Sequence, residues 1–586
     1  MKSTIWQLSF GANLVESGRT RFRIWAPAQK AVAVSIEGQP PLPMARDDDG
    51  WFDVIADCGA GARYRYVLQD GTGIPDPASR AQSGDVHGPS VVVDPSSYAW
   101  HHPRWRGRPW HEAILYELNV GIFGGFGGVA RELPRLANLG ITAVELMPIA
   151  EFPGTRNWGY DGVLTFAPES SYGTPDDLKA LIDTAHGNGL MIFLDVVYNH
   201  FGPDGNYWPA CAPEMFRDDV STPWGLAIDF RRKEVRRFFT DNALYWLLEY
   251  HFDGLRFDAV HAITESDWLD EMAAEVRGQV SHRQVHLVLE NDNNTASHLA
   301  RDFDAQWNDD GHHVLHVLLT GEHEGYYEDY ANEPAARLAQ CLREGFIYQG
   351  EPSRHRDGKL RGMPSAYLPP TAFVLFLQNH DQIGNRALGE RLTKLADPAA
   401  LEAAIALQLL CPQIPLLFMG EETASEKRFL FFTDHNEALA KAVRDGRRRE
   451  FASFRQFSGP NLLKQIPDPN AVDTFECSKP TDDAPRAAER EELYRTLLAL
   501  RRTEIIPRLS GARALDANAV GPAAVIARWR MGDGAMLILA SNLGAEATAI
   551  PPQENKVLFA SSQTAQQAAQ NGQLELYSTI AFLASK

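Results

Sequence analysis

The spacing of hydrophobic residues changes twice along this chain and divides it into three regions. In the first region, apolar and polar side chains alternate in short runs, as at 21–24, 32–36 and 63–68. Alternation of this kind, broken by Gly or Pro about every ten residues, is typical of the antiparallel strands of a β-sandwich. We therefore predict an N-terminal β-sandwich over residues 1–95.

From residue 113 onwards the chain repeats another unit, which consists of an apolar segment, a loop and a helical segment. The apolar segments are continuous, as expected for parallel strands that are covered on both faces. Between them, Thr174 precedes Pro175 and an acidic first turn as a helix N-cap would, and residues 232–250 have helical spacing. The eight strand candidates are 113–120, 142–147, 190–196, 253–258, 286–290, 304–307, 372–378 and 414–419.

Eight such units predict a (β/α)8 TIM barrel, which we place at residues 96–505 with insertions between some units. A doubly wound parallel sheet is the alternative, and the number of units favours the barrel. After a helical stretch at 489–503 the pattern returns to strands, with a hairpin around 532–534. We predict a small C-terminal β-sandwich over residues 506–586, so the fold is multidomain, with a central barrel flanked by two β-sandwiches.

Composition restricts the possible functions more than the fold. The chain is 44% hydrophobic and 23% charged, as in a folded globular protein, and its net charge of −20 disfavours a nucleic acid partner. We expect no membrane span and no secretory leader, and hence a cytoplasmic protein, because neither apolar pattern is present. Five scattered cysteines without a CxxC pair predict neither a disulfide framework nor a zinc site.

Polar side chains follow four of the predicted strands, at the end where a barrel has its active site. The segments read DVVYNH at 195–200, GLRFD at 254–258, LEND at 289–292 and NHD at 379–381. Arg256 lies two residues before Asp258, so both side chains point to the same side of the strand, and Arg256 can hold Asp258 ionised. A lone strand-end aspartate or histidine is more often structural, but three carboxylates on separate strand ends indicate a catalytic site.

Cleavage of an acetal with retention of configuration needs one ionised carboxylate, which attacks the anomeric carbon, and one protonated carboxyl group, which protonates the leaving oxygen. The segments DVVYNH, GLRFDAV, VLEND and QNHDQIGN resemble the four motif regions of the α-amylase superfamily, in the same order. VELMPIAEFPGTRNWGYDGV, AQWNDDGHHVLH and QNHDQIGNRALGERL resemble the maltooligosyltrehalose trehalohydrolase family in particular. This resemblance covers nearly the whole chain.

The resemblance implies a role for each of several residues. Asp258 matches the nucleophile, Glu290 the general acid/base and Asp381 the third catalytic carboxylate. We expect a raised pKa for Glu290, helped by the charges of the other two carboxylates. Residues matching the subsite of the attacked sugar are Tyr160, His200, Arg256 and His380. One departure from the family pattern is Asn119, which stands where a histidine is expected.

The implied reaction is hydrolysis of the α-1,4 bond next to the terminal trehalose of maltooligosyltrehalose, without a cofactor. We expect no metal, because no further oxygen ligands cluster with Asn199, where some amylases bind calcium. Asn308 and Asp309, which follow the sixth strand, are candidates for recognising trehalose in the leaving-group subsites, although a solvated loop is as consistent with their sequence.

Two other interpretations remain open. A glycogen branching or debranching enzyme, or an α-amylase-like glucan hydrolase, would share the barrel and the carboxylates but would not release trehalose. A non-catalytic glucan-binding protein is disfavoured, because a binding protein has little need of an acid beside a nucleophile. The N-terminal β-domain resembles carbohydrate-binding modules, and either glucan binding or packing against the barrel is consistent with its sequence.

Overall fold

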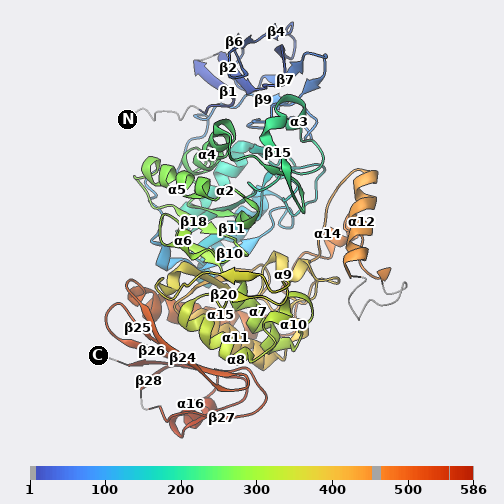
Figure 1. The fold of residues 1–586 in the computed structure, drawn as a ribbon. Helices are drawn as coiled ribbons and strands as arrows, with labels where there is room; N and C mark the ends of the chain where they lie inside the picture. Colours follow the sequence, from blue (N-terminus) through green and yellow to red (C-terminus); the bar gives the residue numbers. More distant parts are fainter. Residues whose placement is uncertain (1–7, 17, 452–462, 554, 585–586) are drawn as a thin grey trace.

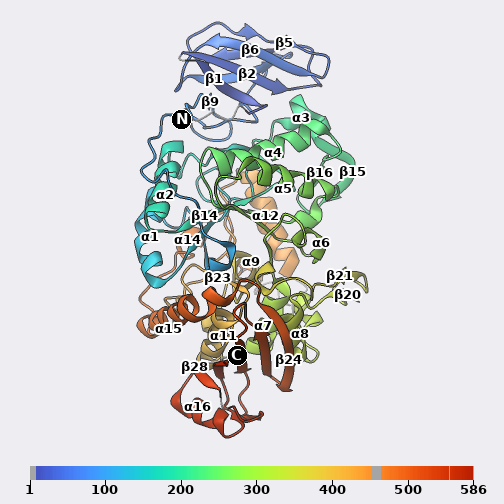
Figure 2. The same cartoon turned by 90° about the vertical axis from the view of Figure 1, so that its left-hand side faces the viewer.

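The protein consists of three parts in a row: an N-terminal β-domain, a central barrel and a C-terminal β-domain (Figures 1 and 2). The computed structural model describes residues 8–16, 18–451, 463–553 and 555–584. Residues 1–7, on which the prediction of no secretory leader partly depends, lie outside the described residues. None of the helices in the described ranges has the length and hydrophobicity that a membrane crossing requires.

The N-terminal part is the predicted β-sandwich of two antiparallel sheets. One sheet has the order β1-β2-β6-β5 and the other β4-β3-β7-β8, with β9 paired to β7. Alternation in β2 explains the packing, since Phe22 is buried and its ring contacts Tyr64 of the other sheet, whereas Arg21 and Arg23 are partly exposed. The strands are β1 (Gly11–Glu16), β2 (Arg19–Trp25), β3 (Val32–Ile36), β4 (Leu42–Pro43), β5 (Ala45–Arg46), β6 (Trp51–Asp57), β7 (Arg63–Leu68), β8 (Gly73–Ile74) and β9 (Ser90–Val91).

The central part is a closed barrel of eight parallel strands in chain order, and each of the eight predicted segments contains one of them. The strands are β10 (Leu115–Leu118), β11 (Ala143–Leu146), β14 (Met191–Val196), β17 (Gly254–Phe257), β18 (His286–Leu289), β19 (Ala305–Trp307), β22 (Phe373–Phe376) and β23 (Ile414–Phe418). The barrel was preferred over a doubly wound sheet on the number of units, and the closed strand order confirms it.

Alternate side chains of the strands enter two separate hydrophobic clusters, one between strands and helices and one inside the barrel. Trp105 and Trp110 of the connector pack against the inner cluster. Phe193 fills the space beside Gly254, where an added Cβ would lie 2.1 Å from the ring, so this position requires glycine. We call the following residues the interior cluster: Ala113, Leu115, Ala143, Met191, Phe193, Val288, Ala305, Trp307, Val374, Phe376, Ile414 and Leu416.

Helices cover the outside of the barrel (Figure 2). The predicted N-cap is confirmed in α2, where Thr174 and Asp177 form a reciprocal capping box, and the helix predicted at 232–250 is α4. The longer barrel helices are α1 (Phe126–Leu139), α2 (Pro175–Gly187), α4 (Lys233–Leu248), α5 (Asp267–Gln279), α7 (Asp309–Thr320), α8 (Pro334–Glu344), α11 (Pro398–Leu410) and α15 (Ala487–Leu500).

Further elements, most of them short, lie between or after the barrel strands. The helix α12 projects from the side of the molecule (Figure 1). The inserted elements are β12 (Ala150–Glu151), β13 (Leu164–Pro168), α3 (Trp208–Cys211), β15 (Phe216–Thr222), β16 (Gly225–Ile228), α6 (Ala296–Leu299), β20 (Gln349–Pro352), β21 (Leu360–Gly362), α9 (His380–Gly384), α10 (Leu392–Leu395), α12 (Glu437–Phe451) and α14 (Val472–Glu476).

The C-terminal part has one large and one small antiparallel sheet, and the predicted hairpin joins β25 to β26. The large sheet has the order β24-β25-β26-β30-β28, and α16 with the small β27-β29 sheet forms the second layer of the sandwich. The elements are β24 (Arg513–Gly521), β25 (Ala524–Arg530), β26 (Met536–Asn542), β27 (Thr548–Ala549), β28 (Lys556–Ala560), α16 (Gln563–Gln570), β29 (Gln573–Leu574) and β30 (Ser578–Ala584).

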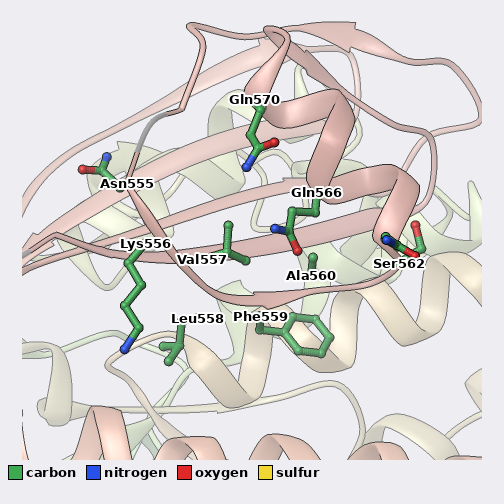
Figure 3. Close-up of a pocket in the computed structure, with 10 residues that line it drawn as sticks. Asn555, Lys556, Val557, Leu558, Phe559, Ala560, Ser562, Gln566 and Gln570 are labelled. Atoms are coloured by element: carbon green, nitrogen blue, oxygen red, sulfur yellow. The ribbon is translucent and has the colours of Figure 1, made fainter.

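An open groove of about 610 Å³ lies between β28 and α16 of the C-terminal part (Figure 3). Amide, hydroxyl and apolar side chains line it, among them Val557, Gln566 and Gln570, together with Lys556. None of the described residues that line this groove carries a carboxylate, the group that acetal cleavage needs. The chemistry indicated by the sequence must therefore be sought at the barrel.

Candidate active site

Arg256 is the centre of a cluster of carboxyl groups at the C-terminal ends of the barrel strands. Its guanidinium is fully buried, with Nη1 2.6 Å from Asp195 and 2.7 Å from Asp258, and with Nη2 3.4 Å from Glu290. On its other side, its Cζ atom lies 4.2 Å from the centre of the Trp307 ring. The arginine and aspartate predicted to share one face of β17 are thus in contact, and one cation orients three carboxylates.

The backbone after Asp258 connects the ends of β17 and β18. Ala259 has a left-handed conformation with φ of 42°, which costs a non-glycine residue about 1–2 kcal/mol. Its N–H group donates a hydrogen bond of 2.5 Å to Oε2 of Glu290. Asn199 donates a weaker bond of 3.4 Å to Asp258. Ala259, which directly follows Asp258, therefore links Asp258 to Glu290. Backbone strain of this kind is often found at functional sites.

The surroundings of Glu290 favour its protonated form. Burial raises its pKa well above the ordinary value for glutamate, while the positive charge of Arg256 acts against the shift. The negative charges of Asp258, Asp309 and Asp381 add to it. The predicted direction of the shift is confirmed, although burial, rather than the neighbouring charges, is its largest cause.

Tyr160 and His200 form one wall of the site. The hydroxyl of Tyr160 donates a hydrogen bond of 2.5 Å to Asp195, and its ring stacks on that of His380 with 5.1 Å between centroids. His200 lies with Nε2 3.0 Å from the carbonyl oxygen of Tyr160. Asn119, the departure from the family pattern, donates to the carbonyl groups of residues 157 and 158 and so fixes the segment that carries Tyr160.

His380 lies between two carboxylates. Its Nδ1 is 2.5 Å from Oε1 of Glu117, its backbone N–H donates to Oε2 of Glu117 at 3.1 Å, and its Nε2 is 3.5 Å from Asp381. Burial acts to lower the pKa of His380, but the charges of Asp381 and Glu117 outweigh it and raise the pKa to about 9. Asn385 in turn donates a hydrogen bond of 3.1 Å to Asp381. The ring therefore carries a positive charge at neutral pH.

Asn308 and Asp309 follow β19 but have different environments. Asn308 is fully buried, its amide donates to the carbonyl of Gly345 at 3.0 Å, and its side-chain oxygen caps α7 by accepting from Gly311. Its polar atoms are thus used within the protein. Asp309 is partly exposed and accepts a hydrogen bond of 3.4 Å from Gln382, and burial followed by the charge of Asp292 raises its pKa to about 7.

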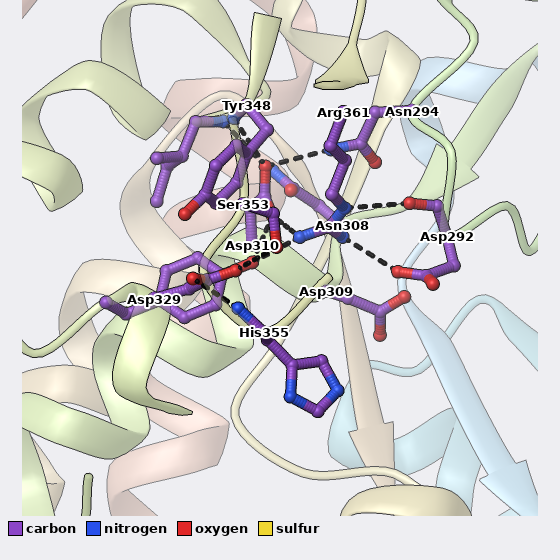
Figure 4. A network of polar contacts seen from close by, with 12 residues as sticks. Asp292, Asn294, Asn308, Asp309, Asp310, Asp329, Tyr348, Ser353, His355 and Arg361 are labelled. Carbon is purple, nitrogen blue, oxygen red and sulfur yellow. Dashed lines mark hydrogen bonds and ion pairs between the residues drawn. The ribbon is translucent and has the colours of Figure 1, made fainter. Parts of the chain in front are cut away.

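A network of polar contacts beside Asp309 supports this wall of the site (Figure 4). Arg361 lies 3.0 Å from the buried Asp310 and 3.1 Å from Asp292, which follows Glu290 by two residues. Asp310 also accepts hydrogen bonds from the backbone N–H groups of 347 and 348. The insertion that carries β20 and β21 is therefore fastened to the ends of β18 and β19, and Figure 4 shows the carboxylate of Asp309 apart from these bonds.

The sequence reasoning missed two residues of this site. Glu117 is the one charged residue in the apolar segment 113–120, and a charge in a buried strand could have indicated a functional residue. Trp224 lies between β15 and β16 with 46% of its surface exposed, and it stacks on His200 with 5.2 Å between ring centroids. An exposed tryptophan offers an apolar face to a sugar ring at the entrance of the site, but nothing in its sequence neighbourhood indicates that position.

The arrangement has the two groups that acetal cleavage with retention requires, a carboxylate fixed by a guanidinium and a carboxyl group whose pKa is raised by burial. Within the described part of the chain, no group of three or more His, Cys, Asp or Glu side chains has an arrangement that could hold a metal ion. An ionised carboxylate beside a carboxyl group with a raised pKa is chemically suited to nucleophilic attack by the one and proton transfer by the other.

Comparison with known proteins gives matches over most of the chain. The family model of the alpha amylase catalytic domain matches residues 83–215, and that of a domain of unknown function, DUF3459, matches residues 512–578. A malto-oligosyltrehalose trehalohydrolase of Deinococcus radiodurans is 42% identical over 501 residues, 83% of this chain and 81% of that protein. One from Saccharolobus solfataricus is 41% identical over 458 residues, 76% of this chain and 80% of that protein.

A solved structure is similar over the whole chain. The crystal structure of a Salmonella typhimurium protein, provisionally named an alpha amylase, is 43% identical in sequence and superposes with a TM-score of 0.93. The match covers 99% of this chain and 100% of that chain, so it includes both β-domains as well as the barrel.

Proposed function

The chain belongs to the malto-oligosyltrehalose trehalohydrolase family of the α-amylase superfamily, and from this premise we propose that it hydrolyses the α-1,4-glucosidic bond next to the terminal trehalose of malto-oligosyltrehalose. The products are trehalose and a malto-oligosaccharide. One observation carries the mechanism: a single buried guanidinium, that of Arg256, contacts both Asp258 and Glu290. This shared contact supports the short separation of carboxyl groups that a retaining mechanism requires.

In the first step, a carboxylate oxygen of Asp258 forms a bond to C1 of the glucosyl residue while the bond from C1 to the trehalose oxygen breaks. Glu290 gives its proton to that oxygen, and trehalose leaves. The raised pKa of Glu290 supports this role, because it favours the protonated form that a general acid needs.

In the second step, water attacks C1 of the glycosyl-enzyme, Glu290 takes a proton from the water, and the bond to Asp258 breaks. The malto-oligosaccharide leaves with retained configuration, and both carboxyl groups return to their starting states. Asp381 and the positively charged His380 face the same sugar and bind its hydroxyl groups, while the ring of Tyr160 packs against the sugar's C–H face.

For the leaving-group subsites we propose Asp309, whose carboxylate is partly exposed beside Glu290 and Asp381. Asn308 shapes this wall as a helix cap, since its polar atoms are bonded within the protein. Asp309→Ala should lower kcat/KM for malto-oligosyltrehalose about tenfold or more, because a hydrogen bond to a charged group is lost. A malto-oligosyl fluoride, which has no trehalose, is the control and should be hydrolysed nearly as before; unchanged trehalose release would contradict the assignment.

The remaining parts of the proposal concern domains and surroundings. We place the domain boundaries at 1–95, 96–505 and 506–586. We further propose that the enzyme works in the cytoplasm on a neutral glucan, without cofactor or metal. It should also have no nucleic acid partner, which its net charge of −20 supports.

The deciding experiment is incubation of the purified protein with maltotriosyltrehalose, maltopentaose and glycogen, each separately, with products separated by chromatography. We expect free trehalose from the first substrate and little turnover of the others, and no products from Asp258→Asn. Shortened or rearranged glycogen without trehalose would instead support an amylase, branching or debranching activity. No turnover of any substrate would support a glucan-binding protein.

A further inference from the structure

Glu117 makes two contacts to one residue at the floor of the site. Both its carboxylate oxygens are used by His380, one by ring Nδ1 at 2.5 Å and the other by the backbone N–H at 3.1 Å. Both side chains are 1% exposed, so water does not screen the pair. The contact connects β10 to the start of α9, 263 residues later in the chain, and fixes the position and rotation of the imidazole ring.

The other side of the ring faces Asp381. With Nδ1–H donated to Glu117, a neutral ring would present a lone pair on Nε2, which lies 3.5 Å from the carboxylate of Asp381. The two acceptors would then repel each other. A doubly protonated ring has an N–H group on each side and satisfies both carboxylates, so the geometry itself favours the imidazolium form.

The surroundings of the ring contain few other charges. The titratable or charged groups around it are Glu117 of β10, Glu145 of β11, Tyr160 between β12 and β13, Arg256 of β17, and Asp381 of α9. Glu145 pairs with Glu117 in the strand register but makes no hydrogen bond to His380. Burial raises the pKa of Glu145 well above the ordinary value, which favours the uncharged form of this neighbour. Arg256 opposes a charge on the ring, which leaves Glu117 and Asp381 to stabilise it.

We propose that Glu117 is a positioning residue for the reaction: its carboxylate keeps the His380 ring doubly protonated, so that Nε2 carries a proton beside Asp381 and can donate it in a hydrogen bond to a hydroxyl group of the attacked sugar. This role rests on the proposed function. It goes beyond the three carboxylates that carry the reaction, because Glu117 lies beneath the ring and acts through His380.

The direct test is an NMR titration of the histidine side chains in the ¹⁵N-histidine-labelled protein, with the His380 signal assigned by its loss in His380→Asn. In the wild type, the ring should stay protonated well above the pH at which free histidine titrates. Glu117→Gln should lower the pKa of this ring by about one unit or more. The matched control is Glu145→Gln, in the same register on the next strand; Glu145 makes no hydrogen bond to His380 and burial favours its uncharged form, so this change should leave the titration nearly unchanged.

The kinetic test uses a malto-oligosyl fluoride, whose departure needs little help from Glu290, so the alkaline limb of kcat reports mainly on other groups. Glu117→Gln should move this limb to lower pH. Glu117→Asp keeps the charge, so its limb should lie closer to that of the wild type. Identical limbs for the wild type and Glu117→Gln would overturn the proposal. A merely structural role would lower the melting temperature without moving either the limb or the titration.

The outcomes separate this proposal from the proposed function. If maltotriosyltrehalose yields no trehalose, the function fails, while the titration still decides whether Glu117 sets the charge of His380. If Glu117→Gln does not fold, the wild-type titration decides alone, because a ring that loses its proton near the ordinary histidine value contradicts the proposal.

Discussion

The two ends of the barrel interior are built from the same eight strands and have opposite chemistry. The end where the strands begin holds the interior cluster, which is apolar and is closed off by Trp105 and Trp110. The end where they finish holds buried charges. The change takes place within two residues of a strand, a rise of about 7 Å, as from Phe193 to Asp195 on β14 or from Leu115 to Glu117 on β10.

The contrast shows how this barrel can bury charged groups. The apolar end excludes water from below, which raises the pKa of Glu290 and strengthens each contact above it. At the charged end nearly every ionised group has a partner, as Arg256 has Asp195 and Asp258. Trp307 lies at the boundary, since it belongs to the interior cluster and supports the guanidinium of Arg256. Stability and chemistry are therefore separated along each strand, and the predictions below test that separation.

The largest effect is expected from two aspartates at opposite ends of β17. Asp258→Asn removes the nucleophile and should lower kcat/KM by about 10⁴-fold or more, with little change in melting temperature. Asp253 precedes the same strand, is fully buried, and accepts hydrogen bonds from Trp105 and from the backbone of Ile192. Enzyme kinetics and thermal unfolding of both variants measure the difference.

Asp253→Asn should lower the stability and leave the activity nearly unchanged, because this carboxylate also pairs with His186 and Arg283. Removing the charge from a buried pair costs about 3–5 kcal/mol of unfolding free energy, while the kcat of the folded protein should remain close to that of the wild type. A variant of Asp253 with normal stability and no activity would contradict the separation of the two ends.

The next effect concerns the acid at the charged end. Glu290→Gln should lower kcat for malto-oligosyltrehalose about 10²–10⁴-fold, the usual contribution of a general acid. The raised pKa of Glu290 means that the wild type is active below that pKa and loses activity as the pH rises through it. The contribution of Glu290 to the alkaline limb should therefore disappear in the variant, which leaves only the loss of activity that follows deprotonation of His380. A limb that persisted unchanged with this substrate would assign the proton transfer to another group.

Much of this architecture could be predicted from the sequence, because two signals are local. Parallel strands covered on both faces are continuously apolar, and all eight were found from that property. Asp258 and Glu290 follow such strands directly, so their common location at one end of the barrel needed no long-range information. To place them there, it was enough to know that each follows a strand and that the strands form a barrel.

The contacts that tune the site could not be predicted, because they depend on partners far apart in the chain. In the sequence, Glu117 is a single polar residue in a buried strand, and no neighbouring residue indicates its contact with His380. Asn308 follows a strand as a binding residue would, yet its bonds to Gly345 and Gly311 make it a helix cap. The exposure of Trp224 beside His200 likewise depends on how an inserted hairpin folds.

A third prediction concerns the apolar end. Phe193 is fully buried in the interior cluster and touches Trp110 and His286, so Phe193→Ala should destabilise the protein by about 3–5 kcal/mol. Chemical denaturation measures this loss. Well below the new melting temperature, kcat should change little, because Asp195 and Arg256 above it remain paired. A comparable loss of kcat in the folded variant would show that the apolar end also positions the charges.

The smallest effect is expected from Glu145, a buried carboxyl group at the charged end of the barrel. Both its oxygens are without a hydrogen bond, and burial, followed by the charge of Glu117, raises its pKa well above the ordinary value of 4.5. Below the ordinary value, the group is protonated in both the folded and the unfolded protein. As the pH rises above it, only the unfolded chain ionises, so stability is lost up to the raised pKa of the folded state.

Glu145→Gln removes this titration and should therefore weaken the decline of melting temperature between acidic and mildly alkaline pH. The two proteins should unfold at similar temperatures near the ordinary glutamate pKa, and the variant should be the more stable one at higher pH. Thermal unfolding over a pH series measures the difference, with kcat on malto-oligosyltrehalose expected to stay close to wild type. A variant that is less stable at high pH would mean that Glu145 is ionised and paired, and that the charged end extends one strand further than the contacts indicate.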